Sequence, residues 1–111
     1  MEITAEDKGA YLKLNLSGNV DSSTAQTFEA RLLGALTGEG RSVLVDLSGV
    51  DFLSSAGLRV FLMGAKKVKG TPLRLVICGA NENVHKVFTM SGFDRILEIA
   101  PDPEAGASRM A

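Results

Sequence analysis

Two adjacent serines, Ser54 and Ser55, occupy the point where a strand-like segment gives way to an amphipathic helical pattern. A serine hydroxyl at the start of a helix accepts a free backbone N–H and stabilises the helix by about 1 kcal/mol. A cap needs only one serine, so the second hydroxyl is free to accept a phosphoryl group. The residues that follow, Ala56 and Gly57, are small, and we expect them to keep this site open to a kinase. The pair therefore predicts either a plain helix cap or a cap beside a phosphoacceptor.

The sequence lacks the motifs that common classes of enzyme require. Leu53 stands where the G-x-S-x-G elbow of a serine hydrolase requires glycine. The only histidine, His85, falls on the expected solvated face of a helix. Neither glycine-rich nucleotide-binding motif occurs, and the single cysteine, Cys78, excludes a disulfide and a multi-cysteine metal site. We predict no catalytic residue, no metal and no cofactor, and hence a binding protein and not an enzyme.

Composition and charge predict a small domain of the cytoplasm. The 111 residues are enough for one domain with an aliphatic core, and 45% of them are hydrophobic. The start of the chain lacks a signal-peptide pattern, and no apolar run reaches the ~18 residues of a membrane span. The net charge is −1, and the densest basic group, Lys66 to Lys69, ends a predicted helix, where cations complement the helix dipole. We therefore expect no membrane insertion and no direct nucleic-acid partner.

The elements that position the serines follow from hydrophobic periodicity. Residues 101–111 contain two prolines and no apolar period, so we expect a mobile tail after a domain of residues 1–100. Ser23 and Gln26 form a capping-box pattern that predicts a helix start. The predicted strands cover 3–7, 10–18, 42–47, 73–78 and 95–99. The predicted helices run over 23–38, from the serines at 54–55 through an apolar stripe at 58–68, and from Asn81 or Asn83 to Gly92.

The resulting order, β-β-α-β-α-β-α-β, predicts a single-domain α/β fold. Such alternation indicates a mostly parallel central sheet with helices packed against it, and the tight turn at Lys8-Gly9 makes the first strand an antiparallel edge. Loops beyond the carboxyl ends of parallel strands usually form the binding rim, and Asp21 and residues 50–55 fall there. We expect Asp46, within a buried strand, to accept hydrogen bonds from local backbone donors. The free domain is expected to be a monomer.

Three stretches of the chain resemble the STAS family, the anti-sigma factor antagonists. The run from Val45 to Arg59, with Asp-Phe-Leu-Ser-Ser-Ala-Gly-Leu at its centre, is similar to the family signature. Leu16 to Asp21 resembles the family's glycine-to-aspartate strand ending, and Leu75 to Phe93 resembles its C-terminal half. The resemblance extends over nearly all of the predicted domain and implies a STAS-like fold.

The resemblance implies a partner switch controlled by phosphorylation. In such a switch, the unphosphorylated protein binds an anti-sigma factor that is also a serine-protein kinase, phosphorylation ends the interaction, and a serine phosphatase restores it. Many family members read Asp-Ser-Ser-Gly or Asp-Ser-Thr-Gly in this loop, whereas this chain has Ser54-Ser55-Ala56-Gly57. Ser55 is therefore the expected acceptor, and Ser54 is the second candidate.

The expected partner-binding surface surrounds these serines. Val60 and Met63 lie off the main apolar stripe of the second helix, and an adaptable methionine suits a partner surface. The alternative is a constitutive docking subunit of a transport or signalling complex, which is not phosphorylated; Ser54 in place of the usual acid keeps it open. The full predicted partner-binding set is Asp21, Asp51, Ser54, Ser55, Ala56, Gly57, Leu58, Val60 and Met63.

Overall fold

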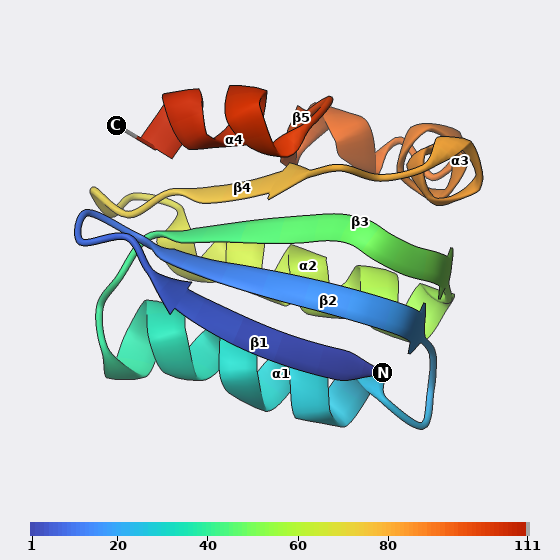
Figure 1. Ribbon diagram of the computed structural model, residues 1–111, viewed down its shortest axis with the longest axis horizontal. Helices are drawn as coiled ribbons and strands as arrows, with labels where there is room; N and C mark the ends of the chain where they lie inside the picture. Colours follow the sequence, from blue (N-terminus) through green and yellow to red (C-terminus); the bar gives the residue numbers. More distant parts are fainter. Residues whose placement is uncertain (111) are drawn as a thin grey trace.

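Five strands form one sheet in the order β1-β2-β3-β4-β5 in the computed structural model, which describes residues 1–110 (Figure 1). β1 pairs antiparallel with β2, and the remaining neighbours are parallel. This arrangement confirms the predicted mostly parallel sheet with one antiparallel edge. The strands are β1 (Glu2–Asp7), β2 (Leu12–Val20), β3 (Val43–Leu53), β4 (Leu75–Cys78) and β5 (Glu98–Ala100). The helices are α1 (Ala25–Leu33), α2 (Ser55–Val68), α3 (Glu82–Met90) and α4 (Pro103–Met110), with short helical turns η1 (Gly34–Gly38) and η2 (Phe93–Arg95).

The main core lies on one face of the sheet, where α1 and α2 run side by side (Figure 1). Alternation along β2 directs Leu14 and Leu16 into this face. Phe61 of α2 contacts Phe28 of α1 and Phe88 of α3 edge-on, with ring centroids 5.0 and 5.6 Å apart. The three rings therefore link α1, α2 and α3 through one core cluster, which holds α2 at a fixed position against the sheet.

Contrary to the predicted mobile tail, residues 103–110 form α4, which packs on the opposite face of the sheet. Asp102 starts this helix by accepting a hydrogen bond of 2.8 Å from the N–H of Ala105. Close packing requires Gly106, because a Cβ there would lie 2.8 Å from Cδ1 of Leu44. The prediction was wrong because small residues make this contact, and small residues leave no apolar period in the sequence. Residue 111 lies outside the described part of the chain.

Polar side chains occupy the second face of the sheet beyond α4. The ammonium of Lys13 lies 3.8 Å from a carboxylate oxygen of Glu6 and 3.6 Å from one of Asp46. Oδ1 of Asp46 accepts hydrogen bonds from the N–H and the hydroxyl of Ser48, at 2.9 and 2.6 Å. The predicted role of Asp46 as an acceptor for local backbone donors is confirmed.

Several element boundaries differ from the prediction. β3 extends to Leu53, beyond residue 47, because its second half pairs with β2 across two register irregularities that break the simple alternation. α1 begins at Ala25, and Ser23 does not cap it, since the Ser23 hydroxyl donates to Asp21. β5 covers residues 98–100, slightly later than predicted. The extension of β3 brings its end directly to the two serines.

Candidate functional site

Ser54 is the N-cap of α2. Its backbone is extended, with φ −86° and ψ 173°, and its Oγ accepts a hydrogen bond of 3.3 Å from the N–H of Gly57. Its carbonyl oxygen accepts the first helical hydrogen bond, 2.9 Å from the N–H of Leu58. Capping, which satisfies a backbone donor left free at the helix start, is therefore the role of Ser54.

Ser55 is the first residue of α2, and its side chain is exposed. Its hydroxyl forms no hydrogen bond with any other residue between 1 and 110. Because Ser54 already caps the helix, the Ser55 hydroxyl is not needed to satisfy a backbone donor at the helix start. A group added to its oxygen would sit near the positive end of the α2 dipole, which favours negative charge.

Gly57 does not keep the site open, contrary to the prediction. It is buried, and a Cβ there would lie 2.6 Å from Cδ1 of Leu53 and 2.7 Å from Cγ1 of Val20. The missing side chain instead lets the first turn of α2 lie directly against the ends of β2 and β3. Access to Ser55 comes from its own position on the outer side of that turn, beside the half-buried Ala56.

Two other predicted contact residues belong to the core. Leu58 and Val60 are 6% and 3% exposed, because α2 packs against the sheet and against α1, so its buried stripe is wider than a single row. The prediction that Val60 lies off this stripe was wrong. Met63 is half-buried and Arg59 is exposed. In the first half of α2, the accessible surface therefore follows a line from Ser55 through Arg59 to Met63.

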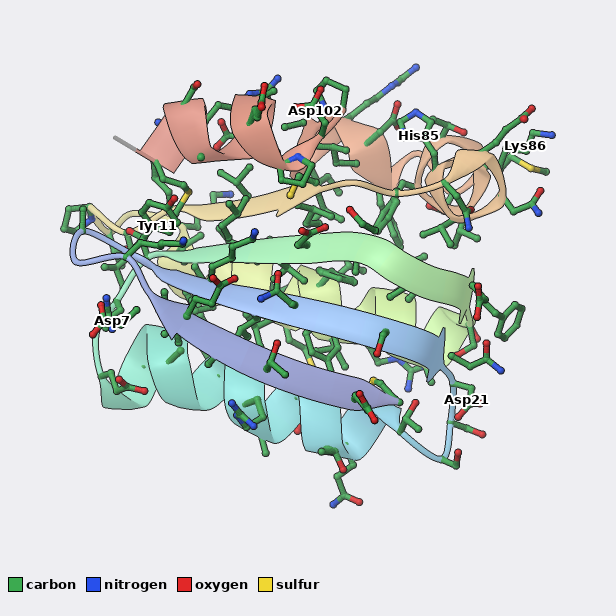
Figure 2. The ribbon with its side chains drawn as sticks, viewed as in Figure 1. Asp7, Tyr11, Asp21, His85, Lys86 and Asp102 are labelled. Atoms are coloured by element: carbon green, nitrogen blue, oxygen red, sulfur yellow. The ribbon has the colours of Figure 1, made fainter. Side chains whose placement is uncertain are left out.

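Asp21 organises the loop after β2, at the end of the strands opposite to Asp7 and Tyr11 (Figure 2). Its Oδ1 accepts hydrogen bonds from the N–H and the hydroxyl of Ser23, at 2.9 and 2.6 Å. These bonds, the hydroxyl first among them, lower the pKa of Asp21 below its ordinary value. Asp21 is therefore an anion in the folded protein at neutral pH, and it is held in one place on the rim.

Hydrogen bonds join the loops at the carboxyl ends of the strands into one surface. The N–H of Ser54 donates to the carbonyl oxygen of Val20 at 2.8 Å, which brings Asp21 beside the start of α2. Asn81, after β4, donates from Nδ2 to the carbonyl oxygen of Val50 at 3.1 Å and caps α3 by accepting from Val84 at 2.8 Å. The sequence left Asn81 and Asn83 as alternative caps, and the structure selects Asn81.

Phe52 is a surface residue of this rim that the sequence did not predict. Its side chain is 52% exposed, next to the exposed Asp51 and in register with Asn19 of β2. A phenylalanine near the end of an apolar strand is usually assigned to the core. The clue in the sequence is that the apolar residues Val50 and Leu53 flank this pair. In the structure both are buried, which leaves the two residues between them facing outward.

Groups for catalysis or metal binding do not gather at the rim. Within residues 1–110, no cluster of three His, Cys, Asp or Glu side chains could hold a metal ion. Cys78 is buried, and burial, reinforced by the charge of Asp46, raises the pKa of its thiol to about 11, so it is no nucleophile at neutral pH. His85 lies exposed on α3 beside Lys86 (Figure 2).

The structure is thus a small α/β domain with an exposed serine at a helix start, on a rim of acidic and apolar side chains. The family described as Mlab, STAS domain matches residues 3–98, and the chain belongs to this STAS domain family of anti-sigma factor antagonists. The predicted family is confirmed, and this membership supports the prediction of a binding protein and not an enzyme. No helix in residues 1–110 combines the length and the apolar character needed to cross a membrane.

Individual relatives agree with this assignment. The chain is 37% identical over 108 residues to the candidate anti-sigma factor antagonist BtrV of Bordetella bronchiseptica, a match that covers 97% of this chain and 93% of BtrV. The crystal structure of an anti-sigma factor antagonist from Mycobacterium paratuberculosis is similar with a TM-score of 0.89 at 21% identity, over 98% of this chain and 92% of that one. The Bacillus cell fate determinant SpoIIAA in its phosphorylated form has a TM-score of 0.74 at 18% identity, over 99% and 100% of the chains.

Proposed function

We propose that this chain is an anti-sigma factor antagonist switched by phosphorylation of Ser55. In its unphosphorylated form it binds an anti-sigma factor that is also a serine-protein kinase, in the cytoplasm and as a monomer. The observation that carries this proposal is that the two serines have different roles. Ser54 caps α2, whereas the Ser55 hydroxyl is exposed and has no hydrogen-bond partner in residues 1–110. The relative BtrV is itself named a candidate anti-sigma factor antagonist, and this name supports an anti-sigma factor as the partner of this chain.

The switching step is a phosphoryl transfer. The Ser55 oxygen attacks the γ-phosphorus of ATP, the bond from that phosphorus to the departing ADP breaks, and the hydroxyl proton passes to a base of the kinase. A serine phosphatase reverses the state by hydrolysis, in which water supplies the oxygen that leaves with phosphate. The chain contributes the acceptor and its presentation, and the kinase contributes the catalytic groups.

Phosphorylation is expected to act on the partner surface and not on the fold. A phosphoserine adds about −1.5 to −2 charges at neutral pH. At the N-terminus of α2 these charges stabilise the helix, by a few tenths to about 2 kcal/mol. Asp21 and Asp51 lie on the same rim, so the phosphorylated surface becomes strongly acidic. A 1,000-fold loss of affinity requires only about 4 kcal/mol, which desolvation and repulsion at the interface readily supply.

The partner surface that we propose combines the accessible members of the predicted set with two additions, Phe52 and Arg59. Phe52 is added because aromatic side chains that enter a partner's pocket carry much of the binding energy of an interface. Arg59 is added because it is exposed on α2 between Ser55 and Met63. Leu58, Val60 and Gly57 support this surface from below, since their side-chain positions are buried. The proposed contact residues are Asp21, Asp51, Phe52, Ser54, Ser55, Ala56, Arg59 and Met63.

The first experiment asks whether Ser55 accepts phosphate. The purified chain is incubated with ATP and a lysate of the source organism, and intact mass and peptide mapping locate any phosphate. We expect one phosphate on Ser55, lost in Ser55→Ala and retained in the matched variant Ser54→Ala. Phosphate on Ser54 would overturn the choice of acceptor. No modification in any variant, together with capture of a partner that ATP does not release, would favour the constitutive docking subunit.

A further inference from the structure

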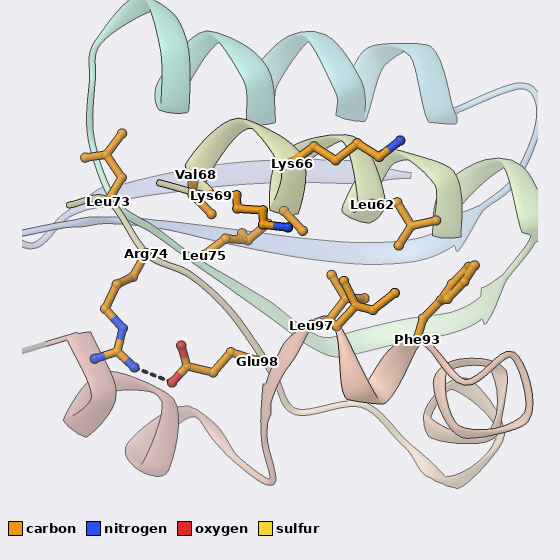
Figure 3. Close-up of a pocket in the computed structure, with 12 residues that line it drawn as sticks. Leu62, Lys66, Val68, Lys69, Leu73, Arg74, Leu75, Phe93, Leu97 and Glu98 are labelled. Carbon is orange, nitrogen blue, oxygen red and sulfur yellow. Dashed lines mark hydrogen bonds and ion pairs between the residues drawn. The ribbon is translucent and has the colours of Figure 1, made fainter. Parts of the chain in front are cut away.

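A groove with an apolar floor lies far from the serine rim, beside the second half of α2. Its volume is about 670 Å³, and the start of β4 and the segment from η2 to β5 form its other walls (Figure 3). Leu75 and Leu97 are buried at its base, while Phe93 is half-buried and Ile96 is 63% exposed. Leu62, Ala65 and Val68 of α2, together with Leu73, complete the apolar lining. Sites that bind small molecules are usually concave and lined mostly by apolar side chains, as this groove is.

The rim of the groove carries an excess of positive charge. Lys66, Lys69 and Arg74 line it together with a single acid, Glu98. Glu98 is already paired, with Arg74 and, at 4.0 Å, with Arg109. Within residues 1–110, Lys66 and Lys69 have no acidic side chain within ion-pair distance, and both are exposed. The lysines complement the dipole at the end of α2, but their charge is otherwise unmatched on a chain whose net charge is −1.

We propose that this groove binds a free single-chain anionic amphiphile, a fatty carboxylate. The alkyl chain lies over Leu75 and Leu97, and the carboxylate faces Lys66 and Lys69. The volume falls within the roughly 300–1,000 Å³ of small-molecule sites, which are mostly apolar with a few polar groups that fix orientation. Twelve residues line the groove, fewer than the ~20–30 per side of a stable protein interface, so a small ligand fits it better than a protein partner.

This site is separate from the proposed switch. Lys66 lies eleven residues after Ser55 on the same helix, which places it about 16 Å further along the α2 axis at 1.5 Å per residue. A ligand in the groove therefore leaves the serine rim free for a partner. Its binding does not rest on phosphorylation, and Ser55→Ala is expected to leave it unchanged.

Titration with dodecanoate below its micelle concentration tests the proposal, with calorimetry for affinity and ¹H–¹⁵N NMR for location. We expect saturable one-to-one binding, with shifts centred on Leu62, Lys66, Phe93 and Ile96. Each methylene removed from the chain should weaken binding up to about fourfold, so decanoate should bind up to about fifteenfold more weakly. Dodecyl maltoside and dodecyltrimethylammonium carry the same alkyl chain without the negative charge, and each should bind at least tenfold more weakly than dodecanoate.

Lys66→Glu and Lys67→Glu form a matched pair, since both reverse one charge in the last turn of α2 and only Lys66 lines the groove. We expect Lys66→Glu to weaken dodecanoate binding about tenfold and Lys67→Glu to change it less than twofold. Ile96→Asp, at an exposed position, should abolish binding while thermal melting stays close to wild type. Equal binding of the three dodecyl compounds, an equal effect of the two lysine variants, shifts centred on the serine rim, or tighter binding of an acidic amphipathic peptide would each overturn the proposal.

Discussion

The N–H of Ser54 donates a hydrogen bond of 2.8 Å to the carbonyl oxygen of Val20. This bond joins the end of β2 to the start of α2, and it places Asp21 and Ser55, each one residue further along, on the same rim. Since Ser54 also caps α2 through its side chain, one residue sets both the direction of the helix and its attachment to the sheet. The exposed Ser55 is thereby presented on a rigid support.

The two serines are expected to differ in their effect on stability. Ser54→Ala removes the cap and should lower the free energy of unfolding by about 1 kcal/mol. Ser55→Ala changes an exposed hydroxyl without a partner in residues 1–110 and should stay within about 0.5 kcal/mol of wild type. Urea denaturation followed by circular dichroism measures both. Equal losses in the two variants would show that the capping role is shared.

Gly57→Ala should destabilise the protein although alanine is the better helix former. The new Cβ meets Leu53 and Val20 at 2.6 and 2.7 Å, and such overpacking costs about 1–3 kcal/mol. Gly34→Ala is the matched control, because Gly34 has helical φ and ψ and a Cβ there meets no atom within 4 Å. This control should gain about 0.5–1 kcal/mol. Thermal melting of the pair checks the prediction, and a gain at both positions would contradict it.

Asp21 should titrate below the ordinary range of an aspartate, because Ser23 donates two hydrogen bonds to its charged form. The stability that it contributes is present above the pKa of the unfolded chain and is lost as the pH falls through the lower, folded pKa. Ser23→Ala removes the stronger donor and should move the pKa of Asp21 upward. Ser22→Ala, at the exposed neighbour, should leave it unchanged. Carboxyl ¹³C NMR during an acid titration measures this pKa, and an identical titration in all three proteins would refute the assignment.

α4 should be necessary to shield one face of the sheet. Met110 is 8% exposed in the cluster with Val76 and Cys78, and Met110→Ala should cost about 2 kcal/mol. Met90→Ala is the control, since Met90 is 86% exposed, and it should stay within about 0.5 kcal/mol of wild type. Labelling of Cys78 by a thiol reagent under native conditions offers a second readout and should be faster in Met110→Ala alone. Rapid labelling of the wild-type thiol would mean that α4 does not cover it.

Phe52→Ala should weaken partner binding while preserving the fold. The side chain is 52% exposed, so its loss should change stability little, whereas loss of an aromatic anchor typically lowers affinity by about 2 kcal/mol or more. Met90→Ala, which removes another exposed apolar side chain, serves as the control for non-specific effects. The affinity of each variant for the partner captured from the lysate gives the answer. Wild-type affinity in Phe52→Ala would remove this residue from the proposed interface.

Local pattern was sufficient to predict the architecture and the place where α2 begins. The alternation in β2, the apolar run that begins β3 and the helical spacing in α2 each reflect burial by neighbours close in sequence, so each leaves a period that can be recognised. The helix start at residues 54 and 55 was predicted for the same reason, because capping is a local hydrogen bond. Ser54 and Ser55 were both candidates for that cap.

Only the tertiary structure decided what each residue of the site does. The choice of Ser54 as the cap depends on how the end of β3 enters α2, and the burial of Gly57 and Val60 depends on how closely α2 lies on β2, β3 and α1. The exposure of Phe52 follows from the register irregularities between β2 and β3. α4 was missed because its contact is made through Gly106, where the absence of a side chain permits close packing. The sequence by itself determined the family, through motifs that resemble those of its members. It also determined the sheet and the segment that carries the serines, because local periodicity and capping reveal them. Burial and accessibility arise between segments distant in the chain, and only the folded structure decides them.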